Sequence, residues 1–258
     1  MNDATRAALA LARRLEERAL NASSVFQSIV YDGWLIGYRP GPTKRLRCVN
    51  AFYASNLPLA EKVAFCTAFY ASVGLPAIFR QLPFSKPAGL DRWLDRNGWI
   101  RFEPTLVLQS SLAEAPQPKT VADAVSIVDV LAWQTLVAQL LDVDRESLAR
   151  LMERAASYPL PHAGAIIREE GEVVACGLLK LEGDHAGLFA LHTAPAWRGR
   201  GLGRAVVAAL LAEARRRGAA TAYLQVTANN APARALYRHF GFSTSHEYWY
   251  RARAGEQH

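Results

Sequence analysis

The second half of the chain alternates between helical and strand-like patterns of apolar residues. Residues 131–141 and 145–158 have helical spacing, with Leu148, Leu151 and Met152 on one face. Four shorter apolar runs between polar turns predict strands, and Glu170-Gly171 predicts a hairpin turn between the second and the third. These strands are expected over residues 124–130, 162–169, 173–182 and 186–193.

A longer amphipathic helix is predicted from Gly201, since Leu202, Val206 and Leu210 are spaced by four residues. It should end at Gly218, after three arginines that suit the negative end of a helix. A short strand over 222–226 follows.

The last predicted helix begins at Asn230, a good N-cap residue, and has Pro232 in its first turn. Gly241 should end this helix, and Phe242 leads into a final strand through Tyr250. The apolar face of the helix consists of Ala233, Leu236, Tyr237 and Phe240.

The first half of the chain shows a similar succession of elements. Residues 1–20 predict a surface helix, in which leucines stand among arginines and glutamates. A helix, a strand, a second helix and a strand are then expected over residues 59–73, 76–82, 89–97 and 101–108. The second of these helices ends at Gly98-Trp99, much as the last helix of the chain ends at Gly241-Phe242.

The length and composition suit one large domain or two domains of ordinary size, with a sizeable buried core. Of the 258 residues 51% are hydrophobic, but no apolar run approaches the ~20 residues of a membrane helix or the core of a secretory signal. We therefore expect a cytoplasmic protein without a membrane partner. Cys48, Cys66 and Cys176 lack metal-ligand spacing, which predicts reduced thiols and no metal.

The net charge of +7 suits an anionic ligand. Because the basic residues are dispersed rather than gathered in a tract, nucleic-acid binding is disfavoured. The strongest anion signal is the loop Arg-Gly-Arg-Gly-Leu-Gly over residues 198–203, which opens a helix directly after a strand. Glycines let backbone N–H groups turn toward an anion, and the helix start adds further free N–H groups. This pattern predicts a pyrophosphate site; a dinucleotide-binding Gly-x-Gly-x-x-Gly motif does not fit the spacing.

Two motifs together resemble the GNAT superfamily of acyl-CoA-dependent N-acyltransferases. Arg198, Gly201 and Gly203 match its Gln/Arg-x-x-Gly-x-Gly/Ala loop, and residues 230–237 match its Asn-x-x-Ala-x-x-Leu-Tyr helix, followed by Gly241-Phe242. The resemblance covers about residues 120–252 and implies an α/β fold with a mixed, mainly antiparallel sheet flanked by helices. It also implies acetyl-CoA as co-substrate, with no metal.

The resemblance assigns roles to particular residues. The backbone of Leu191, His192 and Thr193 would bind pantetheine and polarise the thioester, and Tyr237 would be the general acid for the thiolate. A phenol with a pKa of about 10 suits that task. The remaining co-substrate contacts would be Arg198, Gly199, Arg200, Gly201, Leu202, Gly203, Arg204, Asn230 and Ala233.

The general base stays open at this stage. Residues 186–193 contain no glutamate, and the candidates are His192, Glu182, Asp184 and His162, or a chain of water molecules. Tyr248 to Arg251 could line an acceptor pocket or form an ordinary half-buried strand.

The first half is interpreted as a degenerate copy of the same fold, with an unrelated α+β domain as the alternative. When Gly98 is aligned with Gly241, Leu94 stands where Tyr237 does, and the loop falls near Asn56-Leu57-Pro58, which lacks glycine. The expected organisation is an N-terminal helix over 1–22, a degenerate domain over 23–112, a linker over 113–119 within the Pro-containing stretch 110–120, and a catalytic domain over 120–254.

The expected function is transfer of an acetyl group from acetyl-CoA to a primary amine of a small molecule or amino acid, by direct attack. A second domain that could close over the acceptor favours a small amine. The alternatives are a regulatory protein that binds acyl-CoA without turnover, and an acetyltransferase for protein N-termini or lysines. The sequence leaves the choice between monomer and homodimer open.

Overall fold

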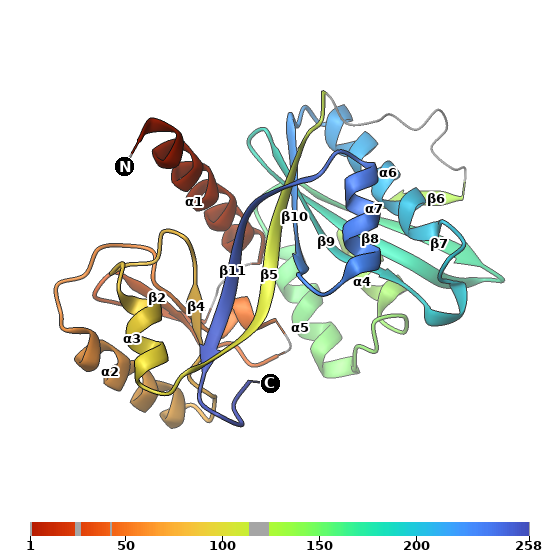
Figure 1. The fold of residues 1–258 in the computed structure, drawn as a ribbon. Coiled ribbons are helices and arrows are strands. Elements are labelled where there is room, and N and C mark those ends of the chain that lie inside the picture. The colour runs from red at the N-terminus through yellow and green to blue at the C-terminus, as the bar shows by residue number, and fades with distance from the viewer. Residues whose placement is uncertain (1, 24–26, 42, 114–123, 258) are drawn as a thin grey trace. The chain divides into compact units, whose positions relative to one another are not determined.

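The structure is a computed structural model that describes residues 2–23, 27–41, 43–113 and 124–257 (Figure 1). The chain divides into two compact units. Unit 1 consists of Met1–Val107, Val226–Asn229 and Thr244–His258, and unit 2 of Leu108–Gln225 and Asn230–Ser243. Each unit contains a mixed sheet flanked by helices, so the predicted α/β class is confirmed.

Unit 2 has a meander of antiparallel strands followed by a parallel crossover. Its strands lie in the order β10-β9-β8-β7-β6, antiparallel from β6 to β9 and parallel between β9 and β10. The predicted elements are present, with ends that differ by a few residues. The elements are β6 Val125–Val128, α4 Val130–Val137, α5 Arg145–Ala156, β7 His162–Glu169, β8 Glu172–Glu182, β9 His185–Thr193, α6 Leu202–Arg216, β10 Thr221–Thr227 and α7 Ala231–His239.

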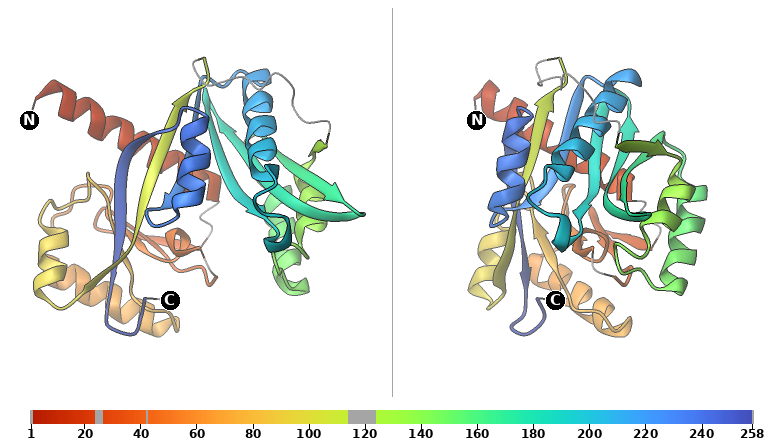
Figure 2. Two further views of the ribbon diagram at one scale, coloured as in Figure 1. Left: turned by 45° about the vertical axis from the view of Figure 1, so that its right-hand side comes forward. Right: turned by 90° about the vertical axis from the view of Figure 1, so that its right-hand side faces the viewer.

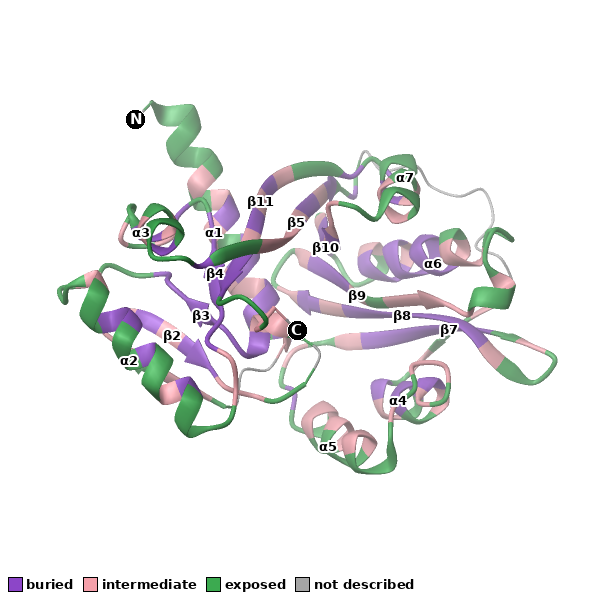
Figure 3. Cartoon of the chain, turned by 60° about the horizontal axis from the view of Figure 1, so that its bottom comes forward, coloured by how far each residue is buried: buried purple, intermediate pink, exposed green. Residues whose placement is uncertain are grey.

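Helices cover both faces of this sheet (Figure 3). Helix α6 packs on β8 and β9, and α4 packs on β7 and β8 from the opposite side. Trp133 and Val137 of α4 form a buried cluster with Ile166 and Leu178, which lie on the face of the sheet toward α4. The alternation of side chains along β7 and β8 therefore gives two apolar faces, as expected for strands without a solvated side.

Unit 1 repeats this plan, with short strands from β1 to β4. Its strands lie in the order β1-β2-β3-β4-β11-β5, and the parallel pair β3/β4 is joined through α2 as β9/β10 is joined through α6. A core around Trp34, Tyr70, Phe79 and Trp99 fills the space beneath α2 and α3. The elements are α1 Asp3–Ser23, β1 Ser28–Tyr31, β2 Trp34–Gly37, β3 Val49–Asn50, α2 Leu59–Ser72, β4 Phe79–Gln81, α3 Leu90–Arg96, β5 Ile100–Ser111 and β11 Ser243–Ala252.

The ends of α3 and α7 have the same geometry, which supports the predicted repeat. Gly98 and Gly241 both have a left-handed backbone, with φ of 79° and 74°. The amide of Trp99 donates to the Leu94 carbonyl at 3.0 Å, and that of Phe242 donates to the Tyr237 carbonyl at 3.2 Å. Leu94 and Tyr237 thus hold equivalent positions relative to the ends of their helices.

The compact units differ from the expected domains in two respects. The last strand, β11, pairs with β4 in antiparallel register and belongs almost entirely to unit 1, so unit 1 is discontinuous in sequence (Figure 2). The chain passes between the units within β5, and Ser110 and Ser111 are part of that strand rather than of a linker. Most of the predicted linker, residues 114–119, lies outside the described residues.

Three composition-based expectations can be compared with the structure. Cys48, Cys66 and Cys176 are free and buried, as predicted for reduced thiols. Over the described ranges, no helix has the length and apolarity needed to cross a membrane. The same ranges hold no group of three His, Cys, Asp or Glu side chains placed to ligate a metal ion.

Candidate functional site

The backbone of β9 diverges from its parallel neighbour before its end. β9 and β10 pair only over His185–Gly187 and Thr221–Tyr223, while on its other side β9 stays paired with β8 up to Thr193. Residues 188–193, including Leu191, His192 and Thr193, therefore present one backbone edge that no β10 pair among the described residues occupies. Such an edge can hydrogen-bond an extended ligand in the manner of an added strand.

A β-bulge in β9 lies within this exposed edge, and sequence reasoning missed it. The β8/β9 register shifts between Cys176 and Leu178, and Ala190 has a φ of 47°, unusual for a residue with a side chain. A Cβ on Gly177 would lie 2.8 Å from Leu191 Cδ2 and 2.8 Å from Leu210 Cδ1, so only glycine allows Leu191 to approach α6 this closely. The bulge re-aims the three residues that follow Ala190.

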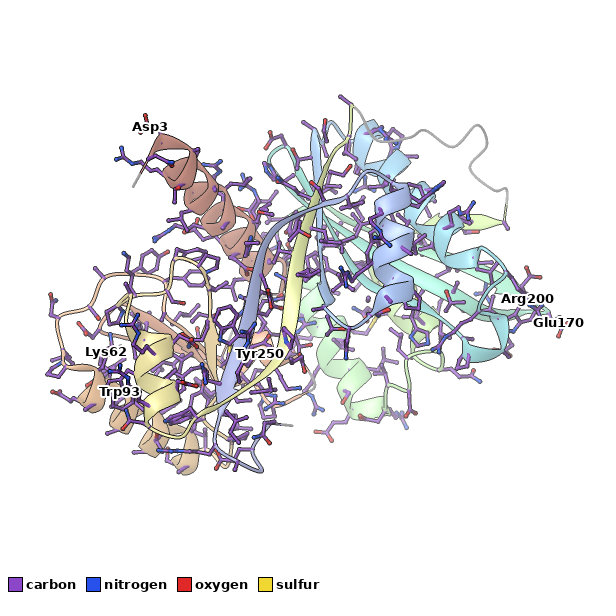
Figure 4. The ribbon with its side chains drawn as sticks, viewed as in Figure 1. Asp3, Lys62, Trp93, Glu170, Arg200 and Tyr250 are labelled. Atoms are coloured by element: carbon purple, nitrogen blue, oxygen red, sulfur yellow. The ribbon has the colours of Figure 1, made fainter. Side chains whose placement is uncertain are left out.

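The predicted anion loop has a left-handed backbone at two of its glycines. Gly199 and Gly201 have φ values of 77° and 82°, and Gly201 is the N-cap of α6. The Ala205 amide donates to the Gly201 carbonyl at 3.1 Å, so the amides of residues 202–204 precede the first hydrogen bond of the helix. Arg198, Arg200 and Arg204 are exposed around this turn, with Arg200 (labelled in Figure 4) 4.5 Å from the Trp197 ring centroid. The result is a positively charged cradle at a helix N-terminus.

β9, α6 and α7 meet at Gly203. A Cβ on Gly203 would lie 3.6 Å from both Thr193 Oγ1 and Leu236 Cδ2. Gly203 in the first turn of α6 therefore lies close to Thr193, which ends the exposed β9 edge. It lies equally close to Leu236, the residue before the predicted acid Tyr237. Three predicted parts of the site, far apart in sequence, lie side by side in unit 2.

Family comparison agrees with this geometry. Residues 130–242 match the family model "Acetyltransferase (GNAT) family". This part of the chain is a GNAT domain. The match includes β9, the cradle and α7.

Two curated relatives extend the comparison. A stretch of 77 residues is 38% identical to the [ribosomal protein bS18]-alanine N-acetyltransferase of Escherichia coli K12, covering 30% of this chain and 52% of that protein. The chain thus aligns with about half the length of this relative. The uncharacterized N-acetyltransferase YobR of Bacillus subtilis is 24% identical over 93% of this chain and 97% of its own length.

Solved structures show the same fold over most of the chain. A GCN5-related N-acetyltransferase from Kribbella flavida superposes with a TM-score of 0.68 at 16% identity, covering 95% of this chain and 96% of that one. A tandem GNAT protein from the clavulanic acid biosynthesis pathway superposes with a TM-score of 0.54 at 18% identity, covering 75% and 70%. The GNAT fold is therefore shown, and both comparisons extend beyond the GNAT domain itself.

Tyr237 of the GNAT domain lies on the buried side of α7. Its side chain is 7% exposed and packs edge-on against Phe242, with ring centroids 6.0 Å apart. Burial raises the pKa of its phenol to about 12, so the hydroxyl keeps its proton at neutral pH. A protonated phenol can act as an acid but not as a base there.

Asn230 has the predicted capping role. Its Oδ1 accepts a hydrogen bond from the Ala233 amide at 3.1 Å, and its carbonyl accepts one from the Arg234 amide at 3.1 Å. Both oxygens therefore serve α7, and the side-chain Nδ2 is the group through which Asn230 could also reach pantetheine.

The four predicted base candidates occupy different environments. Burial, helped by the charge of Arg198, lowers the pKa of His192, which favours the neutral imidazole that a base requires. His162 Nδ1 lies 2.7 Å from the Leu160 carbonyl oxygen, and Asp184 pairs with His185 at 2.6 Å. Of the four, only His192 lies on the exposed edge of β9. Glu182 is the last residue of β8 and stands opposite His185 of β9 in the strand register.

The structure adds Lys180 and Tyr158, which sequence reasoning missed. The Lys180 ammonium lies 3.7 Å from the Tyr158 ring centroid, and both residues line a cavity of about 30 Å³ between α4, α5 and β8. Burial lowers the pKa of Lys180 to about 8. The only signal in the sequence is a lysine at an otherwise apolar strand position.

The aligned loop in unit 1 is filled by the protein itself. The Asp32 carboxylate accepts hydrogen bonds from the Asn56 and Leu57 amides at 3.0 Å, just before α2. It also pairs at 3.0 Å with Lys62, which is labelled in Figure 4. These amides hold the pKa of Asp32 down, at about 2. An internal anion thus stands where the repeat alignment places the pyrophosphate loop.

Proposed function

We propose that the chain is an N-acetyltransferase that moves an acetyl group from acetyl-CoA to the primary amine of a small molecule or amino acid. The observation that carries this proposal is the convergence of the β9 edge, the cradle and α7 at Gly203. In this proposal Arg198, Gly199, Arg200, Gly201, Leu202, Gly203 and Arg204 hold the pyrophosphate. Leu191, His192 and Thr193 hold the pantetheine arm through their backbone, with Asn230 and Ala233 beside it.

The reaction proceeds by direct attack in a ternary complex. The ammonium of the acceptor first loses a proton. His192, on the β9 edge proposed to hold the thioester, is the candidate base, and a chain of water molecules is the alternative. The amine nitrogen then bonds to the thioester carbon, and an N–H group of the β9 backbone stabilises the oxyanion. Finally the C–S bond breaks, Tyr237 donates its proton to the departing thiolate, and the nitrogen gives its second proton back to the Tyr237 phenolate, which leaves the neutral amide, free CoA and the phenol.

Release of free CoA thiol over a panel of amines tests the proposal. We expect turnover with a small primary amine or amino acid and none without an acceptor. Peptides with free N-termini belong in the panel, because the E. coli relative carries the name of a ribosomal-protein alanine acetyltransferase. Turnover only with peptides would make protein N-termini the acceptors in place of small molecules. Absence of thiol release with every amine in the panel would favour an acyl-CoA-binding regulatory protein without turnover.

A further inference from the structure

Unit 1 contains a cavity that the proposed acetyl-transfer site does not use. Its volume is about 640 Å³, within the ~300–1,000 Å³ usual for small-molecule sites. It is lined by the first half of α1, the segment from Gln81 to Asp91 and Trp249 of β11, all of which belong to unit 1. The cavity can therefore be described without reference to unit 2.

Gln81, at the end of β4, supplies a buried amide to this cavity. The residue is 1% exposed, and neither its Nε2 nor its Oε1 has a hydrogen-bond partner among the described residues. Gln81 stands opposite Trp249 in the strand register, so both side chains lie on the same face of the sheet. The side chain of Arg80, the preceding residue, lies on the other face and pairs with Glu16. A buried amide without a partner is costly in a native protein and calls for a physical explanation.

The charged groups around the cavity favour an anion. Arg6, Arg13 and Lys86 line it. The acidic lining residue Asp91 already accepts hydrogen bonds from Arg251 Nε and Trp249 Nε1, each at 2.9 Å. The Arg13 guanidinium lies 5.1 Å from the Phe84 ring centroid, which holds this cation at the wall of the cavity.

We propose that this cavity binds a small anionic molecule that also carries a donor–acceptor edge, such as an amide or a nucleobase. Gln81 offers one acceptor and two donors in a plane, which match such an edge in a bidentate pair. Arg13, with Arg6 and Lys86, neutralises the anionic end. Two kinds of molecule share this chemistry, nucleotides and acylated amino acids.

Calorimetric titration of the full-length protein tests the proposal with AMP and N-acetylglutamate as complete probes, and with acetamide and inorganic phosphate as fragments. Either AMP or N-acetylglutamate should bind at least tenfold more tightly than either fragment. Binding of AMP would identify the ligand as a nucleotide, and binding of N-acetylglutamate would identify it as an acylated amino acid. Gln81→Leu and Gln81→Glu should each weaken that probe at least tenfold. Arg13→Gln should weaken it as well, while Arg14→Gln, which removes an exposed charge from the next position of α1, should not.

A second measurement separates a ligand site from a structural role. Gln81→Leu should raise the thermal midpoint by about 2 °C or more, because it removes a buried amide without a partner. A glutamine needed only for folding would give a lower midpoint instead. The proposal is overturned if neither probe binds, if binding survives both Gln81 variants, or if Gly201→Val abolishes it, since the probe would then occupy the acetyl-CoA cradle.

Discussion

Tyr237 is the residue on which the proposed chemistry depends most. Tyr237→Phe keeps the ring and its packing on Phe242 and removes only the hydroxyl. Acetyl-CoA affinity should change little, because binding rests on backbone groups of β9 and α6. Turnover should fall by ~10²–10⁴-fold, as is typical when an acid–base group is lost. Measurement of kcat with an acceptor found in the amine panel checks this, and an unchanged kcat would refute the assignment.

Gly201 allows a matched test of the cradle, because Gly218 stands at the other end of α6. Both have a left-handed backbone, with φ of 82° and 86°, and a Cβ on either would meet no atom within 4 Å. Valine at either position should therefore strain the backbone to a similar degree. Only Gly201→Val should weaken acetyl-CoA binding in calorimetry, by tenfold or more, because it stands where the ligand approaches. Equal affinities in the two folded variants would exclude the loop as the binding site.

At the scale of an element, the start of α2 depends on the Asp32 carboxylate. Its folded-state pKa of about 2 lies below its ordinary value of 3.8, so its contribution to stability is present above about pH 4 and is lost as the pH falls toward 2. Asp32→Asn should lower the thermal midpoint at neutral pH and make stability fall less steeply between pH 4 and 2. Asparagine also tolerates the φ of 40° at this position.

Asp142→Asn is the matched control for this prediction. Asp142 also has a positive φ, 50°, but is exposed, so its replacement tests the effect of an Asp-to-Asn change in the same backbone conformation. Thermal unfolding followed by circular dichroism from pH 2 to 7 compares the three proteins. Parallel curves for wild type and Asp32→Asn would show that the carboxylate does not stabilise α2.

The structure around the start of α2 leads to a prediction for the number of acetyl-CoA sites per chain. Because Asp32 occupies the amides before α2, and Leu94 stands in place of the tyrosine, unit 1 should bind no acetyl-CoA. Calorimetric titration should give one site per chain. A stoichiometry of two would mean that unit 1 retains a cradle of its own.

At the scale of the whole molecule, unit 1 requires the last strand of the chain. β11 pairs with β4, Arg251 Nε bonds to Asp91 at 2.9 Å, and His246 Nε2 lies 2.9 Å from the buried Glu16 carboxylate. A fragment of residues 1–112 lacks these contacts and leaves β4 with an unpaired edge, so we expect it not to fold. The same fragment with residues 243–257 joined by a Gly/Ser linker should unfold cooperatively. Cooperative unfolding of the short fragment in circular dichroism would show that β11 is dispensable.

The sequence by itself determined the helices, the strands of unit 2 and the position of the cradle. These features depend on local patterns: a left-handed glycine, a capping Asn230 and apolar spacing act within a few neighbouring residues. Strands β1, β2 and β3 escaped prediction because they are two to four residues long, too short for a periodic pattern. Strands β4 and β6 are equally short but lie within the longer runs 76–82 and 124–130, which the sequence predicts to be strands.

Only the tertiary structure decided which distant groups meet. The β9 bulge at Ala190, Asp32 at the start of α2, β11 within unit 1 and the unpartnered amide of Gln81 all depend on segments that are remote along the chain. Hydrogen bonding, burial and pKa shifts follow from neighbours in space, and a residue type or a short spacing does not specify those neighbours. The glycine-rich loop at 198–203 could therefore be predicted from its own residues. The Asp32 contact with the amides before α2 and the cavity beside Gln81 could not be predicted from the sequence.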